Sequence, residues 1–118
     1  MAKRPAIQLR ILLTAETVLG PGKADLLEGV QETGSIAAAS RRMGMSYKRA
    51  WYLIDTMNSY FKEPLVVSTK GGKAGGGAKL TATGSDVLKR YRRMEADAEK
   101  IAVRNLAALA ALARRKPA

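Results

Sequence analysis

The side chains with the clearest chemical potential in this sequence are lysines and arginines that gather in stretches without acidic residues. Residues 33–54 carry four of them, residues 64–85 carry three and residues 87–94 carry four. These charges add up to the formal net charge of the chain, +11, because the other ten basic residues balance its ten acidic residues. Concentrated positive charge attracts polyanions, so the sequence predicts a polyanionic partner that meets three local basic surfaces.

Conventional enzymatic chemistry is not expected, because the chain contains no Cys and no His. Thiolate nucleophiles, Cys/His zinc sites and Ser-His-Asp triads are therefore unavailable. The glycine-rich loop from Lys70 to Lys79 differs from a nucleotide-binding loop, since Gly72-Lys73 is followed by Ala74 and not by the Ser or Thr that would hold Mg²⁺. We expect that the protein is not an enzyme and that it binds neither a cofactor nor a metal ion.

A helix-turn-helix is the element predicted to position the first basic stretch. A short helix over residues 36–43, with Ser35 as its N-cap, is followed by a turn at Gly44 and a longer helix capped by Ser46. The apolar residues of the longer helix follow i, i+3, i+4, i+7 spacing: Ala50, Leu53, Ile54, Met57 and Phe61. A helix-turn-helix lays its second helix in the major groove of DNA, so double-stranded DNA is the expected partner.

The second helix supplies the candidate DNA-reading residues. On a helical wheel centred on buried Ala50, the outward arc holds Lys48, Tyr52, Asp55 and Ser59. The candidates for DNA contact are Ser46, Tyr47, Lys48, Arg49, Trp51 and Tyr52. Each pair also has an alternative to DNA contact that stays open. For Trp51 and Tyr52 the alternative is packing against the wing or a neighbouring helix. For Lys48 and Arg49 it is a solvated helix face.

A β-hairpin over residues 65–81 is predicted to follow the second helix as a wing. Its strands flank the loop that begins at Lys70, whose glycines allow close approach to DNA and whose lysines neutralise phosphates; a mobile linker is the alternative. Contacts to phosphate are expected from Ser35, Arg41, Arg42, Lys70, Lys73 and Lys79.

The remaining chain predicts an N-terminal hairpin and a long final helix. Residues 6–14 alternate as a half-buried strand that pairs with residues 17–19 in a hairpin over 6–20, and Gly20-Pro21-Gly22 breaks the chain before a first helix over 24–33. The proline-free segment 82–114 predicts one helix, whose near-heptad apolar spacing suggests a homodimer. The dimerisation residues are expected to be Tyr91, Met94, Ala98, Ile101, Asn105, Leu109 and Leu112.

The fold class is therefore mostly α with a small β component (α+β): a winged helix-turn-helix with an N-terminal β-hairpin and a long C-terminal dimerisation helix. The chain is long enough for one domain, residues 1–118, with the three shorter helices within 23–62. No apolar run is long enough for a membrane span and the start lacks a secretion signal, so we expect a cytoplasmic, nucleoid-associated protein without membrane contact.

Several short motifs occur together within residues 20–95: Gly34-Ser35-Ile36, Gly44-Met45-Ser46-Tyr47-Lys48-Arg49-Ala50-Trp51, Met57-Asn58, Pro64-Leu65-Val66, Gly71-Gly72-Lys73, Gly75-Gly76-Gly77-Ala78 and Leu80-Thr81. Together they resemble the N-terminal DNA-binding domain of the ModE family of bacterial molybdate-responsive transcriptional regulators, which is similar to LysR-type winged helix-turn-helix domains.

The resemblance implies a dimeric, sequence-specific regulator of molybdate transport or molybdenum-cofactor genes, with recognition residues at Ser46, Tyr47, Lys48 and Tyr52 and a wing at residues 70–79. Full-length members carry a C-terminal oxyanion-binding module after the long helix, and this chain ends at Ala118. A standalone form is therefore expected, and three possibilities stay open for it: a separate effector-sensing protein supplies the signal, the chain senses another cue, or it binds DNA constitutively. The alternatives are a nucleoid-type structural protein without strong sequence preference and a membrane-surface or protein-interaction module.

Overall fold

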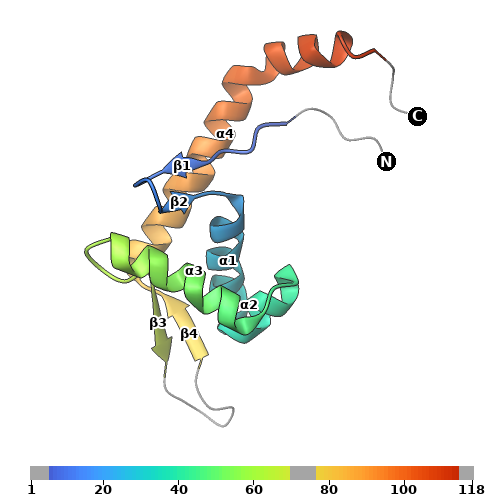
Figure 1. The fold of residues 1–118 in the computed structure, drawn as a ribbon. Coiled ribbons are helices and arrows are strands. Elements are labelled where there is room, and N and C mark those ends of the chain that lie inside the picture. The colour runs from blue at the N-terminus through green and yellow to red at the C-terminus, as the bar shows by residue number, and fades with distance from the viewer. Residues whose placement is uncertain (1–5, 70–76, 115–118) are drawn as a thin grey trace.

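The computed structural model describes residues 6–69 and 77–114 (Figure 1). In chain order its elements are β1 (Ile11–Leu12), β2 (Val18–Leu19), α1 (Pro21–Thr33), α2 (Ile36–Met43), α3 (Tyr47–Tyr60), β3 (Val66–Thr69), β4 (Gly77–Leu80) and α4 (Ala82–Ala111). Each pair of strands forms a separate antiparallel hairpin, β1 with β2 and β3 with β4. The predicted α+β winged-helix class is confirmed.

The core lies where α1 meets the other elements. Leu26, Leu27 and Val30 of α1 are fully buried, as their spacing on one helical face predicts. They pack with the buried side of α3 and with Leu65, the residue that leads into β3. Burying each such Leu stabilises the fold by roughly 1.5–3 kcal/mol, so α1 is the element around which the rest of this small fold is built.

Helix ends fall where the capping residues predict. The side chains of Ser35 and Ser46 each accept a hydrogen bond of 3.0 Å from a backbone N–H of the helix that follows. Gly34 and Gly44 end α1 and α2 with φ of 72° and 70°, a left-handed conformation that costs glycine little. These caps confirm the predicted bounds of α2 and the predicted start of α3.

Two predicted helix boundaries were wrong, and the first strand is shorter than predicted, Ile11–Leu12 instead of residues 6–14. The sequence Gly20-Pro21-Gly22 does not break the chain before α1, because Gly20 is the N-cap and Pro21 is the first residue of the helix. Proline suits that position, since the first N–H groups of a helix have no partner within it and the ring already holds φ near the helical value. At the other end of the chain α4 stops at Ala111, three residues before the predicted Arg114.

The N-terminal segment is attached to α4, an arrangement that local sequence patterns did not predict. The Tyr91 hydroxyl donates a hydrogen bond of 2.5 Å to the Leu9 carbonyl, and the backbone N–H of Ile7 donates to the Glu99 carboxylate at 2.9 Å. Burial raises the pKa of Tyr91, and the nearby Glu95 adds to this effect. Figure 1 shows the N-terminal segment running beside α4, whose far half projects beyond the other elements.

An ion-pair cluster joins α4 to α1. The Arg92 guanidinium lies 2.8 Å from an Asp25 oxygen and 2.9 Å from a Glu28 oxygen on α1, and 3.0 Å from Glu95 on its own helix. Partial burial opposes the charge, but hydrogen bonds to these three carboxylates outweigh that effect and raise the pKa of Arg92. The Arg92 guanidinium therefore helps to hold α4 against α1.

The wing is held at both of its strands. Val66 and Ala78 point inward and are buried, and the backbone N–H of Ala78 donates to the carbonyl of Gly34, at the end of α1, at 2.9 Å. The first turn of α4 lies against the start of β3, where Thr81 donates from its hydroxyl to the Pro64 carbonyl at 2.6 Å. Within the described residues, no helix is both long and apolar enough to cross a membrane.

The closest approach between the wing and α4 gives a stability prediction. A Cβ added at Gly84 would lie 2.1 Å from the Leu65 carbonyl oxygen, a backbone atom that cannot rotate away. We expect Gly84→Ala to lower the free energy of unfolding in urea by roughly 1–3 kcal/mol, because overpacking exceeds the ~1 kcal/mol gain in helix propensity.

Gly22→Ala is the matched control, since a Cβ there meets nothing within 4 Å. This substitution should leave stability unchanged or raise it by up to ~1 kcal/mol. Equal unfolding midpoints for the two variants would contradict the close packing of α4 on β3.

Candidate nucleic-acid interface

The exposed face of α3 is the candidate interface. Its inward side chains Ala50, Ile54 and Met57 are fully buried, while Lys48, Tyr52, Asp55 and Ser59 on the opposite side are exposed. The outward arc expected from the helical wheel is therefore the arc that solvent reaches. A helix buried on one side and free on the other can enter a groove without losing its own packing.

The turn between α2 and α3 sets the angle of α3. Gly44 donates its backbone N–H to the carbonyls of Ser40 and Arg41, and Met45 donates to Ser40 at 3.0 Å. Small residues bring α1 and α2 together, because a Cβ at Gly29 would lie only 2.9 Å from the Ala39 Cβ. The helix-turn-helix is thus held by backbone hydrogen bonds on one side and by close helix packing on the other.

The start of α3 carries an aromatic pair that lies beside the wing. Tyr47 and Trp51 form an edge-to-face contact with ring centroids 6.4 Å apart. Trp51 is half-buried, packs against the core and lines a hollow of about 250 Å³ that also involves Ser68 and Ala78 of the wing. Trp51 thus packs on the core of its own chain and remains partly exposed toward the hollow beside the wing. Tyr47 is exposed.

Arg49 and Tyr52 form a second pair on the opposite flank of α3. The Tyr52 ring is 59% exposed, and the Arg49 guanidinium carbon lies 5.7 Å from its centroid. A cation–π contact at an exposed site contributes roughly 0.5–1 kcal/mol. It pre-orders two long side chains at the edge of the exposed face while leaving both accessible.

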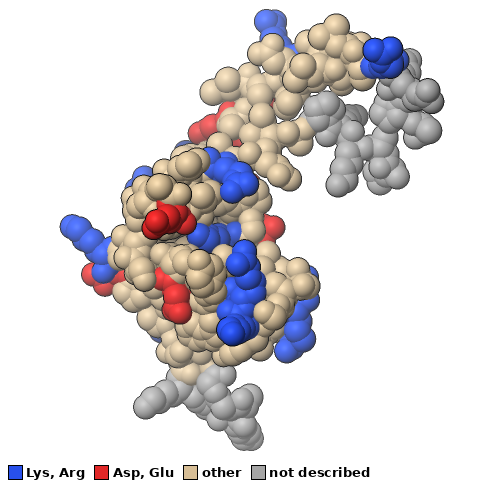
Figure 2. All heavy atoms as spheres, viewed as in Figure 1, with Lys and Arg blue, Asp and Glu red and all other residues tan. Residues whose placement is uncertain are grey.

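The cations of the predicted basic stretches have different surroundings. Figure 2 shows Lys and Arg side chains on the face over which α3 lies, with acidic side chains among them. Arg41, Lys48 and Lys79 are exposed and form no salt bridge with a carboxylate of the described residues. Arg42, by contrast, lies 2.6 Å from Glu32.

The prediction of a third basic surface over residues 87–94 was wrong in part. Arg90 pairs with Asp86 one turn earlier at 3.1 Å, and Arg92 is enclosed by three carboxylates. Asp25 and Glu28 are distant in sequence, and Asp86 and Glu95 lie about one helical turn from the arginines with which they pair. A stretch of sequence without acidic residues therefore did not mean that its arginines are unpaired.

Two of the other predicted phosphate contacts, Lys70 and Lys73, lie outside the described residues. Ser35 is half-buried, and its hydroxyl already accepts the Ala38 N–H as the cap of α2. Ser46 is exposed, although its hydroxyl likewise accepts the Arg49 N–H.

Most predicted dimerisation residues are exposed along α4. Ile101 is 82% and Leu112 is 79% exposed, Met94, Asn105 and Leu109 are also exposed, and Ala98 is half-buried. Tyr91 must be removed from this set, because it is fully buried within the chain and bonds to Leu9. Heptad spacing cannot separate a residue that faces a partner from one that faces the protein's own N-terminal segment.

Asn58, which the sequence analysis names only as part of the Met57-Asn58 motif, is a positioning residue. Its side-chain carbonyl accepts the backbone N–H of Leu65 at 2.7 Å, and its amide donates to the carbonyl of Val66 at 3.2 Å. These bonds join α3 to the first residues of the wing. The sequence offered one signal for this role of Asn58. The residues after Pro64 begin an extended segment, and their first backbone N–H groups need an acceptor from outside the hairpin.

Known proteins share this part of the chain. Residues 23–85 match the family described as bacterial regulatory helix-turn-helix protein, lysR family. The molybdenum transport protein ModE of Azotobacter vinelandii is 44% identical over 79 residues, which are 67% of this chain and 29% of that protein. The molybdenum-pterin-binding protein MopB of Rhodobacter capsulatus is 42% identical over 83 residues, 70% of this chain and 31% of that protein.

The DNA-binding transcriptional dual regulator ModE of Escherichia coli K12 is 36% identical over 85 residues, 72% of this chain and 32% of that protein. The chain thus spans about a third of the length of these curated relatives. The resemblance drawn from the motifs is confirmed for the segment that holds the helix-turn-helix and the wing.

The role of Asn58 gives a second stability prediction. Asn58→Leu preserves side-chain size but leaves the Leu65 N–H and the Val66 carbonyl without their partner, so unfolding in urea should require roughly 1–3 kcal/mol less free energy. Ser59→Ala, one residue further on the exposed face, should change stability by less than ~0.5 kcal/mol. If Asn58→Leu were as stable as Ser59→Ala, these bonds would not hold the wing to α3.

Proposed function

The chain belongs to the LysR family of bacterial regulatory helix-turn-helix proteins, and on this premise we propose that it is a sequence-specific, homodimeric DNA-binding regulator of molybdate transport or molybdenum-cofactor genes. The exposed face of α3 reads bases in the major groove, and the wing contacts the phosphate backbone. The observation that carries the proposal is α3 itself, buried through Ala50, Ile54 and Met57 and exposed through Lys48, Tyr52 and Ser59.

Side-chain chemistry on this face supports base readout. Lys48 lies in the first turn of α3, where the end of a recognition helix approaches base edges, and lysine donates hydrogen bonds to guanine O6 and N7. Tyr52 lies one turn further along and adds a hydroxyl and an apolar ring. Arg41 on α2 and Lys79 on β4 are exposed cations and are the proposed contacts with phosphate.

The link to molybdenum rests on the relatives. Proteins named for molybdenum transport and for molybdenum-pterin binding share 42–44% identity with this chain over the DNA-binding segment. We propose the same class of target genes here. A separate effector-sensing protein is the proposed source of the signal.

A second copy of the chain is the proposed partner of α4. The apolar side chains of Ile101 and Leu109 lie on the half of α4 that projects beyond the other elements, and Leu112 follows directly after its end (Figure 1). Packing these side chains against a symmetric copy removes their apolar area from water, and each Å² that is buried stabilises the dimer by roughly 25 cal/mol. A two-fold dimer places two recognition helices on half-sites about one DNA turn apart, roughly 34 Å, or a multiple of it.

Substitutions on α3 test base readout. Lys48→Ala and Tyr52→Ala should each reduce the preference for a selected binding site over a scrambled one by about 1–3 kcal/mol at a contacted base pair. Fluorescence anisotropy on both duplexes, after selection of the site from random DNA, measures this difference. Lys100→Ala on α4 is the charge-matched control and should keep the preference.

The same data test the main competing function. An equal loss of affinity on every sequence would indicate a structural DNA-binding protein of the nucleoid type, which uses the same basic surface without reading bases.

Substitutions on α4 test the dimer. Ile101→Glu places a charge in the proposed seam and should raise the dimer dissociation constant at least tenfold, which corresponds to about 1.4 kcal/mol. Val103→Glu is the matched control, because Val103 is also an exposed β-branched residue but lies on the opposite side of the helix. Sedimentation velocity reports both. A larger effect at Val103 than at Ile101 would contradict the proposed seam.

A further inference from the structure

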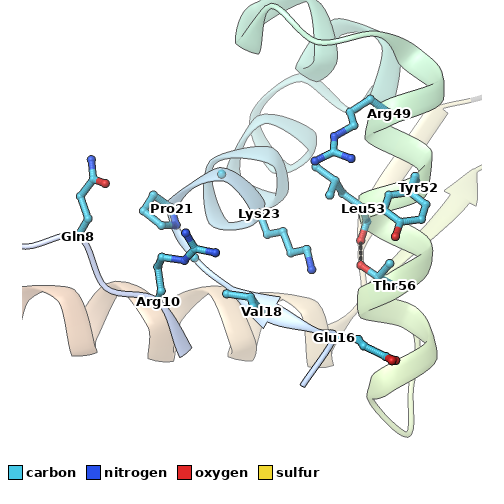
Figure 3. Close-up of a pocket in the computed structure, with 12 residues that line it drawn as sticks. Gln8, Arg10, Glu16, Val18, Pro21, Lys23, Arg49, Tyr52, Leu53 and Thr56 are labelled. Atoms are coloured by element: carbon cyan, nitrogen blue, oxygen red, sulfur yellow. Dashed lines mark hydrogen bonds between the residues drawn. The ribbon is translucent and has the colours of Figure 1, made fainter. Parts of the chain in front are cut away.

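A hollow lies beside α3 on the flank away from the wing. It is an open pocket of about 550 Å³ between α3, the start of α1 and the N-terminal segment (Figure 3). Its rim includes Arg10 from the N-terminal segment, Lys23 from α1 and Arg49 from α3. We call it the α1–α3 pocket.

The three cations of this pocket come from three separate elements and keep their charges available. None of Arg10, Lys23 and Arg49 forms a salt bridge with a carboxylate of the described residues, whereas Arg42, Arg90 and Arg92 each do. Figure 3 shows the Lys23 and Arg49 side chains extending into the space between α1 and α3. Burial, and to a lesser extent the charge of Arg49, lowers the pKa of Lys23, as expected of a partly buried ammonium group with a second cation nearby.

The start of α1 adds a weaker attraction for anions at the same place. Gly20 provides no side-chain cap, so the first N–H groups of this 13-residue helix remain free of a capping partner. A Cβ at Gly22 would meet nothing within 4 Å, which leaves the backbone accessible there. Free helical N–H groups and the positive end of the helix dipole both favour an oxyanion.

We propose that the α1–α3 pocket binds a phosphate group. The inference rests on the proposed function for its geometry: when α3 lies in the major groove, one DNA backbone passes on the flank of the wing and the other passes on the flank of this pocket. Arg49 and Tyr52 line the pocket and also border the exposed face of α3, so the phosphate site is continuous with the base-reading surface.

Acidic residues define where the phosphate site ends. Glu16 lies on the rim of the α1–α3 pocket, and it also lines the next hollow along α3 together with Asp55. Like charges repel a phosphate, so the site is confined to the first half of α3, near Arg49 and Lys23.

The test compares the salt dependence of DNA binding for variants of opposite sign. Lys23→Gln removes one cation and should reduce the slope of log K against log[salt] by about 0.9 for each phosphate that the variant no longer neutralises, equally on selected and scrambled duplexes. Over a fourfold rise in salt concentration, the affinity of Lys23→Gln for DNA should therefore fall by a factor roughly threefold smaller than the affinity of the wild type does. Lys100→Gln, at an exposed position on α4, is the matched control and should keep the wild-type slope.

Glu16→Gln is the second variant, and it guards against a fold defect in Lys23→Gln. Removing the acid from the rim should tighten DNA binding by about two- to tenfold without changing which site is preferred, an effect that a damaged fold would not produce. Unchanged affinity in Glu16→Gln and an unchanged slope in Lys23→Gln, together with no shift of the wild-type amide resonances on addition of inorganic phosphate, would overturn the phosphate site.

The source of the phosphate is separated by a titration with inorganic phosphate alone. Shifts of the Gly22 and Lys23 amide resonances in wild type, abolished in Lys23→Gln, with no change in the DNA salt slope, would assign the pocket to a free phosphate. A reduced slope in Lys23→Gln assigns it to the DNA backbone. Wild-type binding without any sequence preference would defeat the proposed regulator but leave the comparison of wild type with Lys23→Gln intact.

Discussion

Ala50, Ile54 and Met57 are fully shielded from solvent when α3 packs on the core, and this burial fixes the rotation of α3 about its own axis. Turning α3 would expose large apolar side chains whose burial is worth roughly 1.5–3 kcal/mol each. The direction in which Lys48 and Tyr52 point therefore follows from side chains that never meet a partner. The caps at Ser46 and Gly44 set where the helix begins, and the buried stripe sets which face is offered.

The two flanks of α3 differ in how they are closed. On one side Asn58 bonds to the backbone of Leu65 and Val66, and Trp51 and the wing enclose a smaller hollow of about 250 Å³. On the other side the α1–α3 pocket remains open, and its lining includes the cations at positions 10, 23 and 49. In the proposed complex, each DNA backbone beside α3 therefore meets a different surface, a hairpin on one flank and a cationic hollow on the other.

Net charge describes this protein less well than the pairing of its charges. Arg90 and Arg92 belong to a strongly basic stretch, yet both are paired, and Arg92 joins α4 to α1 through Asp25 and Glu28. A partly buried arginine with three carboxylate partners contributes to architecture and adds little to the field seen by a polyanion. The cations that remain without a described carboxylate partner include those at positions 48 and 49, at the start of α3.

Local patterns were sufficient for features that depend on neighbours in the chain. Capping serines, left-handed glycines and the i, i+4, i+7 stripe determined α2, α3 and the outward arc, because helix capping and amphipathicity act within one or two turns. The wing and the family resemblance followed from motifs of the same kind. Contacts between distant residues were decided only by the tertiary structure. Tyr91 has heptad spacing, but it is buried within the chain, where its hydroxyl donates a hydrogen bond to the carbonyl of Leu9, 82 positions earlier. Arg92 and Asn58 likewise find partners on α1 and at the start of the wing. The α1–α3 pocket exists only because residues 10, 23 and 49 meet at one surface, and no local spacing encodes a meeting of three elements.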